Sequence, residues 1–114
     1  MITDMKKKNR VRKSQEFQKL IHSAAKKANA SFVLYYAPKA EEEARIGVSL
    51  SRKMGKAVER NLYKRQIRMM CQEIIDFETY PYDCIVIARF GYKERSYAIN
   101  KNNLEKLMLN AIIQ

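Results

Sequence analysis

The chain has 114 residues, of which 46% are hydrophobic and 31% charged, so it is long enough for one domain with its own core and too short for two. Its 23 Lys and Arg residues outnumber 12 Asp and Glu residues and give a formal net charge of +11. A charge of this size and sign indicates a polyanionic partner, for which nucleic acid is the first candidate.

The N-terminal residues 1–13 are polar and basic, and we expect them to form a mobile arm before a single domain that spans residues 14–114. Ser14 can cap the first helix. The apolar residues that follow have the spacing of one buried stripe and predict a helix from Gln15 to about Lys26: Phe17, Leu20, Ile21 and Ala24.

Two apolar segments in the first half of the chain have the character of strands. Residues 31–37 are rich in β-branched and aromatic side chains and end at Pro38, which cannot continue a strand ladder. Residues 44–51 alternate apolar with small residues, and we expect them to form a hairpin with the preceding strand.

In the second half of the chain, Gly55 marks a basic loop, and the residues after it predict a long basic helix to about Phe77 and then a strand over Asp83–Arg89. A final helix is expected after Asn102, because Glu105 three residues later resembles a capping box. The predicted order of elements favours an α+β sandwich with helices packed on a small sheet. That order is helix, two or three strands, helix, strand and helix.

The basic helix is the strongest candidate for a binding site. Residues 52–68 hold seven cationic side chains and one carboxylate, Glu59. At about 100° per residue, an arc of roughly 140° collects five polar or cationic side chains: Arg60, Asn61, Lys64, Arg65 and Arg68. A solvated helix face normally mixes Lys with Glu, whereas this face is nearly all positive. We expect it to bind phosphate, while the apolar side, with Val58, Leu62 and Ile67, packs on the protein.

Residues for catalysis by the polypeptide are missing. His22 is the only histidine, so a histidine pair for RNA cleavage is absent, and no zinc-site or phosphate-loop motif occurs. Cys71 and Cys84 lie in apolar surroundings without a CxxC pattern, which favours buried reduced thiols. We therefore expect no catalytic or metal-binding side chain. No stretch approaches the ~20 apolar residues of a membrane span and no signal peptide is recognisable, so we expect a cytoplasmic protein.

Aromatic side chains offer a second binding feature. For Phe17 or Tyr35 taken singly, a place in the core is the safer interpretation. As a pair they can line a cleft between helix and sheet, where aromatic rings stack on unpaired bases.

The segment K-A-V-E-R-N-L-Y-K-R-Q-I-R, preceded by G-V-S-L-S-R-K-M-G, resembles the arginine-asparagine motif of the protein subunit of bacterial ribonuclease P. The resemblance covers nearly the whole chain. Supporting matches are Phe17 in Q-E-F-Q-K-L, the segment F-V-L-Y-Y, Arg45 with Gly47 in A-R-I-G-V, and D-C-I-V-I-A-R ending at Arg89.

The resemblance implies a single-domain αβββαβα sandwich, similar to a ribosomal protein domain, with a left-handed crossover around the basic helix against the usual right-handed rule. It also implies two partners, ribonuclease P RNA and precursor tRNA, in an endonuclease that hydrolyses one phosphodiester to remove the 5′ leader. Mg²⁺ would be held mainly by RNA, and no obligate protein partner is expected.

The resemblance implies two sets of contacts. Docking on the RNA subunit would involve Arg52, Lys53, Lys56, Arg60, Asn61, Lys64, Arg65 and Arg68. Phe17 and Tyr35, with Arg89 nearby, would line a cleft for the single-stranded leader. Ile21 stands where many members place a second aromatic residue of this cleft.

Two other classes of protein fit a small basic chain. A structural or translational RNA-binding protein of ribosomal type, without a role in cleavage, has a similar composition. A DNA-binding protein ranks last, because no helix-turn-helix pair or dimerisation segment is recognisable.

Overall fold

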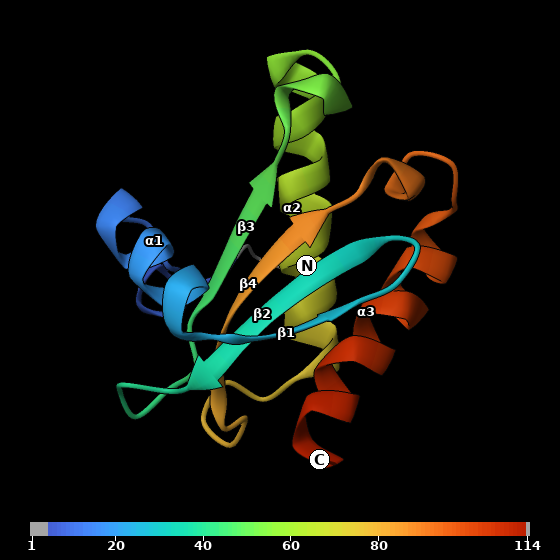
Figure 1. Ribbon diagram of the computed structural model, residues 1–114. Coiled ribbons are helices and arrows are strands. Elements are labelled where there is room, and N and C mark those ends of the chain that lie inside the picture. Colours follow the sequence, from blue (N-terminus) through green and yellow to red (C-terminus); the bar gives the residue numbers. More distant parts are fainter. Residues whose placement is uncertain (1–4, 114) are drawn as a thin grey trace.

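The computed structural model, which describes residues 5–113, consists of one four-stranded mixed sheet with helices on its faces (Figure 1). The strands lie in the order β1-β2-β4-β3. The strands are β1 (Ala25–Ala28), β2 (Phe32–Pro38), β3 (Ile46–Leu50) and β4 (Tyr82–Ala88). The α-helices are α1 (Ser14–Ser23), α2 (Ala57–Ile74) and α3 (Tyr97–Ile113), and the short 3₁₀ turns are η1 (Lys7–Asn9), η2 (Arg52–Met54) and η3 (Phe90–Tyr92). This order confirms the αβββαβα sandwich.

The first helix is shorter than expected. It ends at Ser23, and the residues that were predicted to extend it form β1 instead, in which Lys26 lies opposite Tyr35 of β2. Asn29 makes the turn, because its side-chain oxygen accepts hydrogen bonds from the backbone N–H groups of Ser31 and Phe32, each at 3.1 Å. Pairing with β2 therefore overrides the helical preference of the Ala- and Lys-rich sequence.

The expected hairpin between the second and third strands is wrong. β2 pairs antiparallel with β1 and β4, whereas β3 lies at the edge of the sheet and pairs only with β4, in parallel. A parallel pair needs a crossover, and α2 provides it. In Figure 1, β3 and β4 point the same way, β4 lies to the right of β3, and α2 passes behind them, so the crossover is left-handed.

The main core fills the space between the sheet and two of the helices, α2 and α3. Alternate strand residues point into it, including Phe32 and Leu34 of β2 and Val86 of β4, all fully buried. The helices contribute Ile67, Met70, Cys71, Leu104, Met108 and Ala111. The other face of the sheet carries Tyr35, Gly47 and Ile85, and α1 lies over it.

The apolar side of α2 only partly packs on the protein. Ile67 and Met70 are buried as expected, but Val58 and Leu62 are 81% and 53% exposed. They lie in the first two turns of α2, which project beyond the sheet (Figure 1). The expectation that they pack is therefore wrong, because no other element within residues 5–113 extends far enough to cover them.

The last helix begins five residues before the expected cap at Asn102. Ser96 caps it instead, because its hydroxyl oxygen accepts a hydrogen bond from the N–H of Ile99 at 3.3 Å. The two cysteines are free and buried, as the sequence predicts. No helix within residues 5–113 combines the length and apolar character needed to cross a membrane.

The described part of the basic N-terminal segment lies against the body. Met5, Asn9 and Val11 are buried, and the N–H of Val11 donates to the carbonyl oxygen of Ile46 on β3 at 3.1 Å. The Asn9 amide donates to the Glu43 carboxylate and the Ala44 carbonyl oxygen, each at 3.1 Å. The mobility expected for residues 1–13 stays a prediction; residues 1–4 lie outside the described residues.

Asn100 joins three parts of the fold and offers a test of it. Its amide donates to the Tyr92 carbonyl oxygen at 2.9 Å, and its side-chain oxygen accepts from the Ser31 hydroxyl at 2.7 Å. We expect Asn100→Ala to lower the free energy of unfolding by about 1–3 kcal/mol, because two buried polar groups each lose a hydrogen bond. Urea denaturation measures this loss. The exposed Asn110 of α3 is the matched control, and an equal effect of Asn110→Ala would contradict the assignment.

Candidate nucleic-acid interface

The cations predicted for α2 form one side of that helix. Asn61 and Arg65 are exposed, and Arg60, Lys64 and Arg68 are half-buried. Arg60 is also structural, because its Nε donates to the carbonyl oxygen of Gly55 at 3.2 Å. The side chains of Arg65 and Lys64 have no hydrogen-bond or ion-pair partner within residues 5–113. Their charge is therefore available to an external anion.

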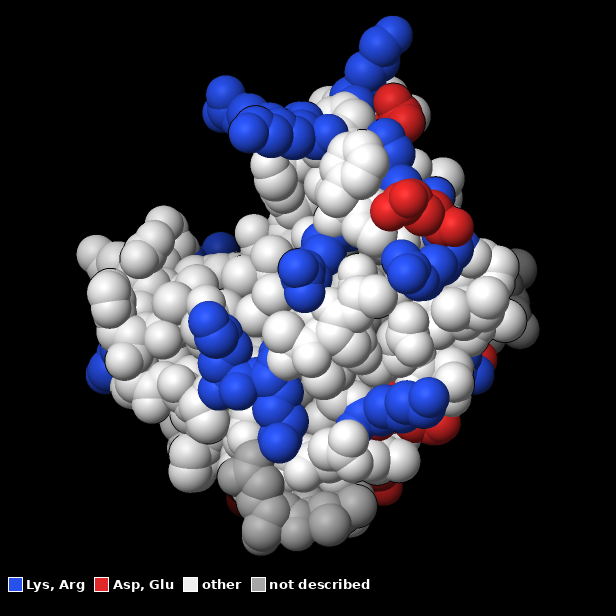
Figure 2. All heavy atoms as spheres, turned by 45° about the vertical axis from the view of Figure 1, so that its right-hand side comes forward, with Lys and Arg blue, Asp and Glu red and all other residues white. Residues whose placement is uncertain are grey.

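The turn before α2 extends this basic surface. Arg52, Lys53 and Lys56 are all exposed, and blue side chains gather at the top of Figure 2, where η2 and the first turns of α2 project. Gly55 permits the tight turn, because its φ of 136° lies in a region that residues with a Cβ rarely adopt. Glu59, the single carboxylate of this segment, accepts a hydrogen bond from the backbone N–H of Lys56 at 3.2 Å. Its position is thus explained by capping of α2.

The register of the sheet places Phe17 over β3 and β4. Lys26, Tyr35, Ile85 and Gly47 lie opposite one another on successive strands, so their side chains share one face. A Cβ at Gly47 would lie 2.6 Å from Phe17 Cζ and 2.7 Å from Ile85 Cδ1. The ring of Phe17 therefore rests where Gly47 has no side chain.

A groove of about 510 Å³ runs along the outer edge of β3. Its lining from the N-terminal segment, α1, β3 and α2 consists of Arg10, Val11, Arg12, Ser14, Phe17, Gln18, Ile46, Val48, Ser49, Leu50, Lys64 and Arg68. Phe17 is half-buried, so part of its ring faces this space. The groove brings the aromatic residue predicted for the leader cleft together with two cations predicted to dock on the RNA subunit.

Tyr35 and Arg89 lie outside the lining of this groove. Tyr35 is on β2, two strands away from β3, and the ammonium of Lys26 lies 6.0 Å from the centroid of its ring. Arg89 follows β4 four residues beyond Ile85, or about 13 Å along the strand. Its guanidinium Nη1 donates to the carbonyl oxygen of Asn29 at 2.9 Å. Their predicted roles toward a leader stay predictions.

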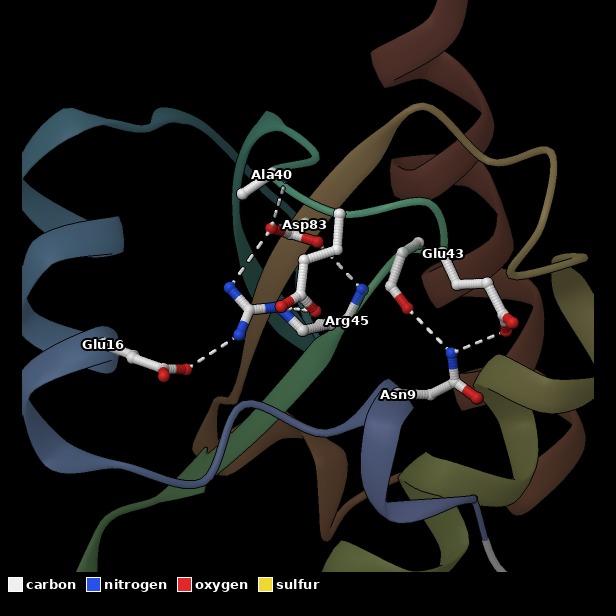
Figure 3. A network of polar contacts seen from close by, with 8 residues as sticks. Asn9, Glu16, Ala40, Glu43, Arg45 and Asp83 are labelled. Carbon is white, nitrogen blue, oxygen red and sulfur yellow. Dashed lines mark hydrogen bonds and ion pairs between the residues drawn. The ribbon is translucent and has the colours of Figure 1, made fainter.

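An ionic network holds α1 against the sheet and was not predicted from the sequence. Arg45, just before β3, extends between Glu16 of α1 and Asp83 of β4 (Figure 3). Its Nη1 lies 2.9 Å from Glu16 Oε2, and its Nη2 lies 3.5 Å from Asp83 Oδ2. Asp83 is buried and also accepts hydrogen bonds from the N–H groups of Ala40 and Arg45. In the sequence, Arg45 was noted only as part of the A-R-I-G-V match to the family, and that match assigned it no structural role.

The described side chains favour binding over reaction. Burial raises the pKa of the Cys71 thiol to about 12 and raises the pKa of Cys84 as well, so both thiols stay protonated at neutral pH. We expected His22 to be a partly buried helix residue, because it lies beside the apolar stripe of α1, but it is exposed at the end of that helix. Within residues 5–113 no group of three or more His, Cys, Asp or Glu side chains is placed to hold a metal ion.

The α+β fold, the basic surface and the aromatic groove define a small RNA-binding protein. A profile of the family "Ribonuclease P" matches residues 5–112. The ribonuclease P protein component of Mesoplasma florum is 39% identical over 92% of this chain and 96% of its own length, and that of Bacillus velezensis is 43% identical over 90% and 89%. The chain therefore belongs to the ribonuclease P protein family.

Solved structures agree with this assignment. The ribonuclease P protein of Staphylococcus aureus matches with a TM-score of 0.78 at 33% identity, over 90% of this chain and 94% of that one. The Thermotoga maritima protein, at 24% identity and a TM-score of 0.75 over 87% and 94%, shares the fold. Membership of this family implies RNA binding, tRNA processing and partnership with ribonuclease P RNA. The comparisons support this function over that of a ribosomal-type RNA-binding protein.

The close approach of Phe17 to β3 can be tested by adding one methyl group. We expect Gly47→Ala to displace Phe17 and to lower the free energy of unfolding by about 1–3 kcal/mol, because the added Cβ overlaps the ring. Ser49→Ala is the matched control, since Ser49 is two residues further along the same face of β3. Equal stability of both variants in urea denaturation would contradict the packing of Phe17 on Gly47.

Proposed function

We propose that this protein binds ribonuclease P RNA through the cations of η2 and α2 and receives the 5′ leader of precursor tRNA in the groove beside Phe17. Binding in these two places promotes endonucleolytic removal of the leader and yields the mature 5′ end. The observation that carries the proposal is the shared groove, in which Phe17 lies beside Lys64 and Arg68. RNA subunit and leader would therefore meet on adjoining surfaces.

The charge of α2 supports docking on a folded RNA. Arg52, Lys53, Lys56 and Arg65 are exposed, and like charges this close together oppose one another unless a polyanion compensates them. Phosphates recognised by Lys and Arg supply that compensation and release bound counterions. Asn61, exposed on the same side, can add a hydrogen bond to a phosphate or a sugar.

The surroundings of Phe17 support contact with a single strand. One side of its ring packs on the sheet at Gly47, which fixes its orientation, and the ring remains partly open to the groove. Stacking of an unpaired base on such a ring contributes about 1–3 kcal/mol and tolerates any sequence. Leader affinity that depends little on sequence would favour precursor over mature tRNA.

In this proposal the RNA subunit carries out hydrolysis and holds the catalytic Mg²⁺. No carboxylate lines the groove within residues 5–113, and Glu16 and Asp83 are both paired with Arg45, which makes them a poor set of metal ligands. Catalysis would require no side chain of this protein and no second protein chain. Cleavage of precursor tRNA would take place in the cytoplasm.

The decisive experiment is Mg²⁺-dependent cleavage of a precursor tRNA by a bacterial ribonuclease P RNA, at low Mg²⁺, with and without this protein. Stimulation of correct 5′ cleavage is the expected result. An RNA subunit that cleaves alone at high Mg²⁺ but gains nothing from the protein would overturn the proposal. It would favour an RNA-binding protein without a role in cleavage.

Arg65→Ala tests docking on the RNA subunit, because the Arg65 side chain is exposed and has no hydrogen-bond or ion-pair partner within residues 5–113. We expect weaker binding to ribonuclease P RNA and a salt dependence reduced by about 0.7–0.9 in log K against log salt for each lost phosphate contact. Filter binding over a series of salt concentrations measures both. Lys106→Ala, on the exposed side of α3, is the control and should bind as the wild type does.

Phe17→Leu tests the leader site, since Leu keeps an apolar contact with the sheet and removes the aromatic face. We expect the holoenzyme to lose part of its preference for precursor over mature tRNA, by up to the ~1–3 kcal/mol of one stacked base. Affinity for the RNA subunit should stay unchanged. Preserved discrimination would assign Phe17 a packing role alone.

A further inference from the structure

A second hollow, of about 450 Å³, lies beside the N-terminal segment. Its lining comes from residues 7–13, α1 and the segment before β3: Lys7, Lys8, Arg10, Arg12, Lys13, Glu16, Glu41 and Arg45. No residue of α2 contributes to it. The proposed RNA-docking surface and this hollow are therefore separate.

Both carboxylates of this basic hollow are already paired. Arg45 Nη1 lies 2.9 Å from Glu16 Oε2, and Arg45 Nε lies 3.9 Å from Glu41 Oε2. Lys8 is paired outside the lining, with Glu43 at 2.6 Å. Both acidic groups of the lining are thus paired with one cation, Arg45, and the remaining charge of the hollow is positive.

Three further cations of the hollow are free to meet a ligand. The side chains of Lys7, Arg12 and Lys13 are exposed and have no hydrogen-bond or ion-pair partner among residues 5–113. The buried Nε of Arg45 also lacks a hydrogen-bond acceptor within that part of the chain. Several donors without acceptors around one hollow favour an anionic ligand with several oxygens.

The basic hollow adjoins the Phe17 groove. Arg10 and Arg12 line both, so the two spaces share one wall of positive charge. Lys64 and Arg68 of α2, next to the proposed RNA subunit, also line the groove. Arg10 and Arg12, the residues that the two hollows share, belong to the N-terminal segment. A single strand that enters beside α2 and stacks at Phe17 would next reach Arg10 and Arg12.

We propose that the basic hollow binds phosphates of the leader upstream of the nucleotides held at Phe17. This inference rests on the proposed function, because it requires a leader in the groove. Flexible Lys side chains and a lack of aromatic residues in the lining fit a backbone contact without base selection. The hollow would thus lengthen the contacted leader without adding a sequence preference.

The test compares precursors whose leaders grow one nucleotide at a time, bound to the assembled holoenzyme. Lys7→Gln/Lys13→Gln removes two cations that line the basic hollow and not the groove. Lys93→Gln/Lys106→Gln removes the same charge from exposed positions outside both spaces. Thermal unfolding of the free variants checks that the fold is intact.

In the wild type and the control we expect affinity to rise again once the leader extends beyond the groove. The salt dependence should steepen by about 0.7 in log K per added phosphate contact. In Lys7→Gln/Lys13→Gln this second rise should be lost while short leaders bind as in the wild type. The proposal is overturned if the wild type shows no second rise, if the variant keeps it, or if the variant weakens binding of the RNA subunit. Failure of the proposed function would give a different result, because precursors with short leaders would then bind no better than mature tRNA.

Discussion

Parallel hydrogen bonding between β3 and β4 determines where every part of the interface lies. It puts β3 at the edge of the sheet, with Gly47 opposite Ile85 and beneath Phe17. It also requires the α2 crossover, whose left hand places α2 on the face away from α1 (Figure 1). A right-handed crossover with the same strand order would put α2 where α1 lies and fill the groove. The departure from the usual hand is thus what leaves an aromatic ring and a basic helix on two sides of one strand.

The sequence predicted the elements better than their pairing. The spacing of apolar residues located α2 and β4, because each element is long and its apolar residues follow a clear pattern. The positive charge of α2 identified the exposed side of that helix. It missed β1, since residues 25–28 are Ala and Lys and become a strand only through pairing with β2. It likewise missed that β3 pairs with β4, because alternation defines a strand but not its neighbour. Phe17 was recognised, whereas Arg10, Arg12 and the Arg45 network depend on contacts between distant segments that no local pattern records.

Ion pairs within the protein engage several of its carboxylates, so the unpaired charge of its surface is mainly positive. Hydrogen bonds from Lys8 and Lys101 lower the pKa values of Glu43 and Glu73, which therefore stay ionised and paired with those cations into mildly acidic solution. Arg45 engages the carboxylates nearest the groove. Few acidic groups then remain to repel phosphate near η2, α2 and residues 7–13. The arrangement concentrates attraction where RNA is proposed to bind.

The N-terminal segment also affects how this chain behaves without RNA. A sheet whose edge strands show free N–H and C=O groups invites other chains to pair with it. At one edge, the Val11 N–H donates to the Ile46 carbonyl oxygen and so covers part of β3. At the other edge, β1 carries Lys26 and Lys27, whose charges repel an approaching strand of the same kind. Both edges of the sheet therefore carry a feature that disfavours intermolecular strand pairing of the kind that begins fibrils.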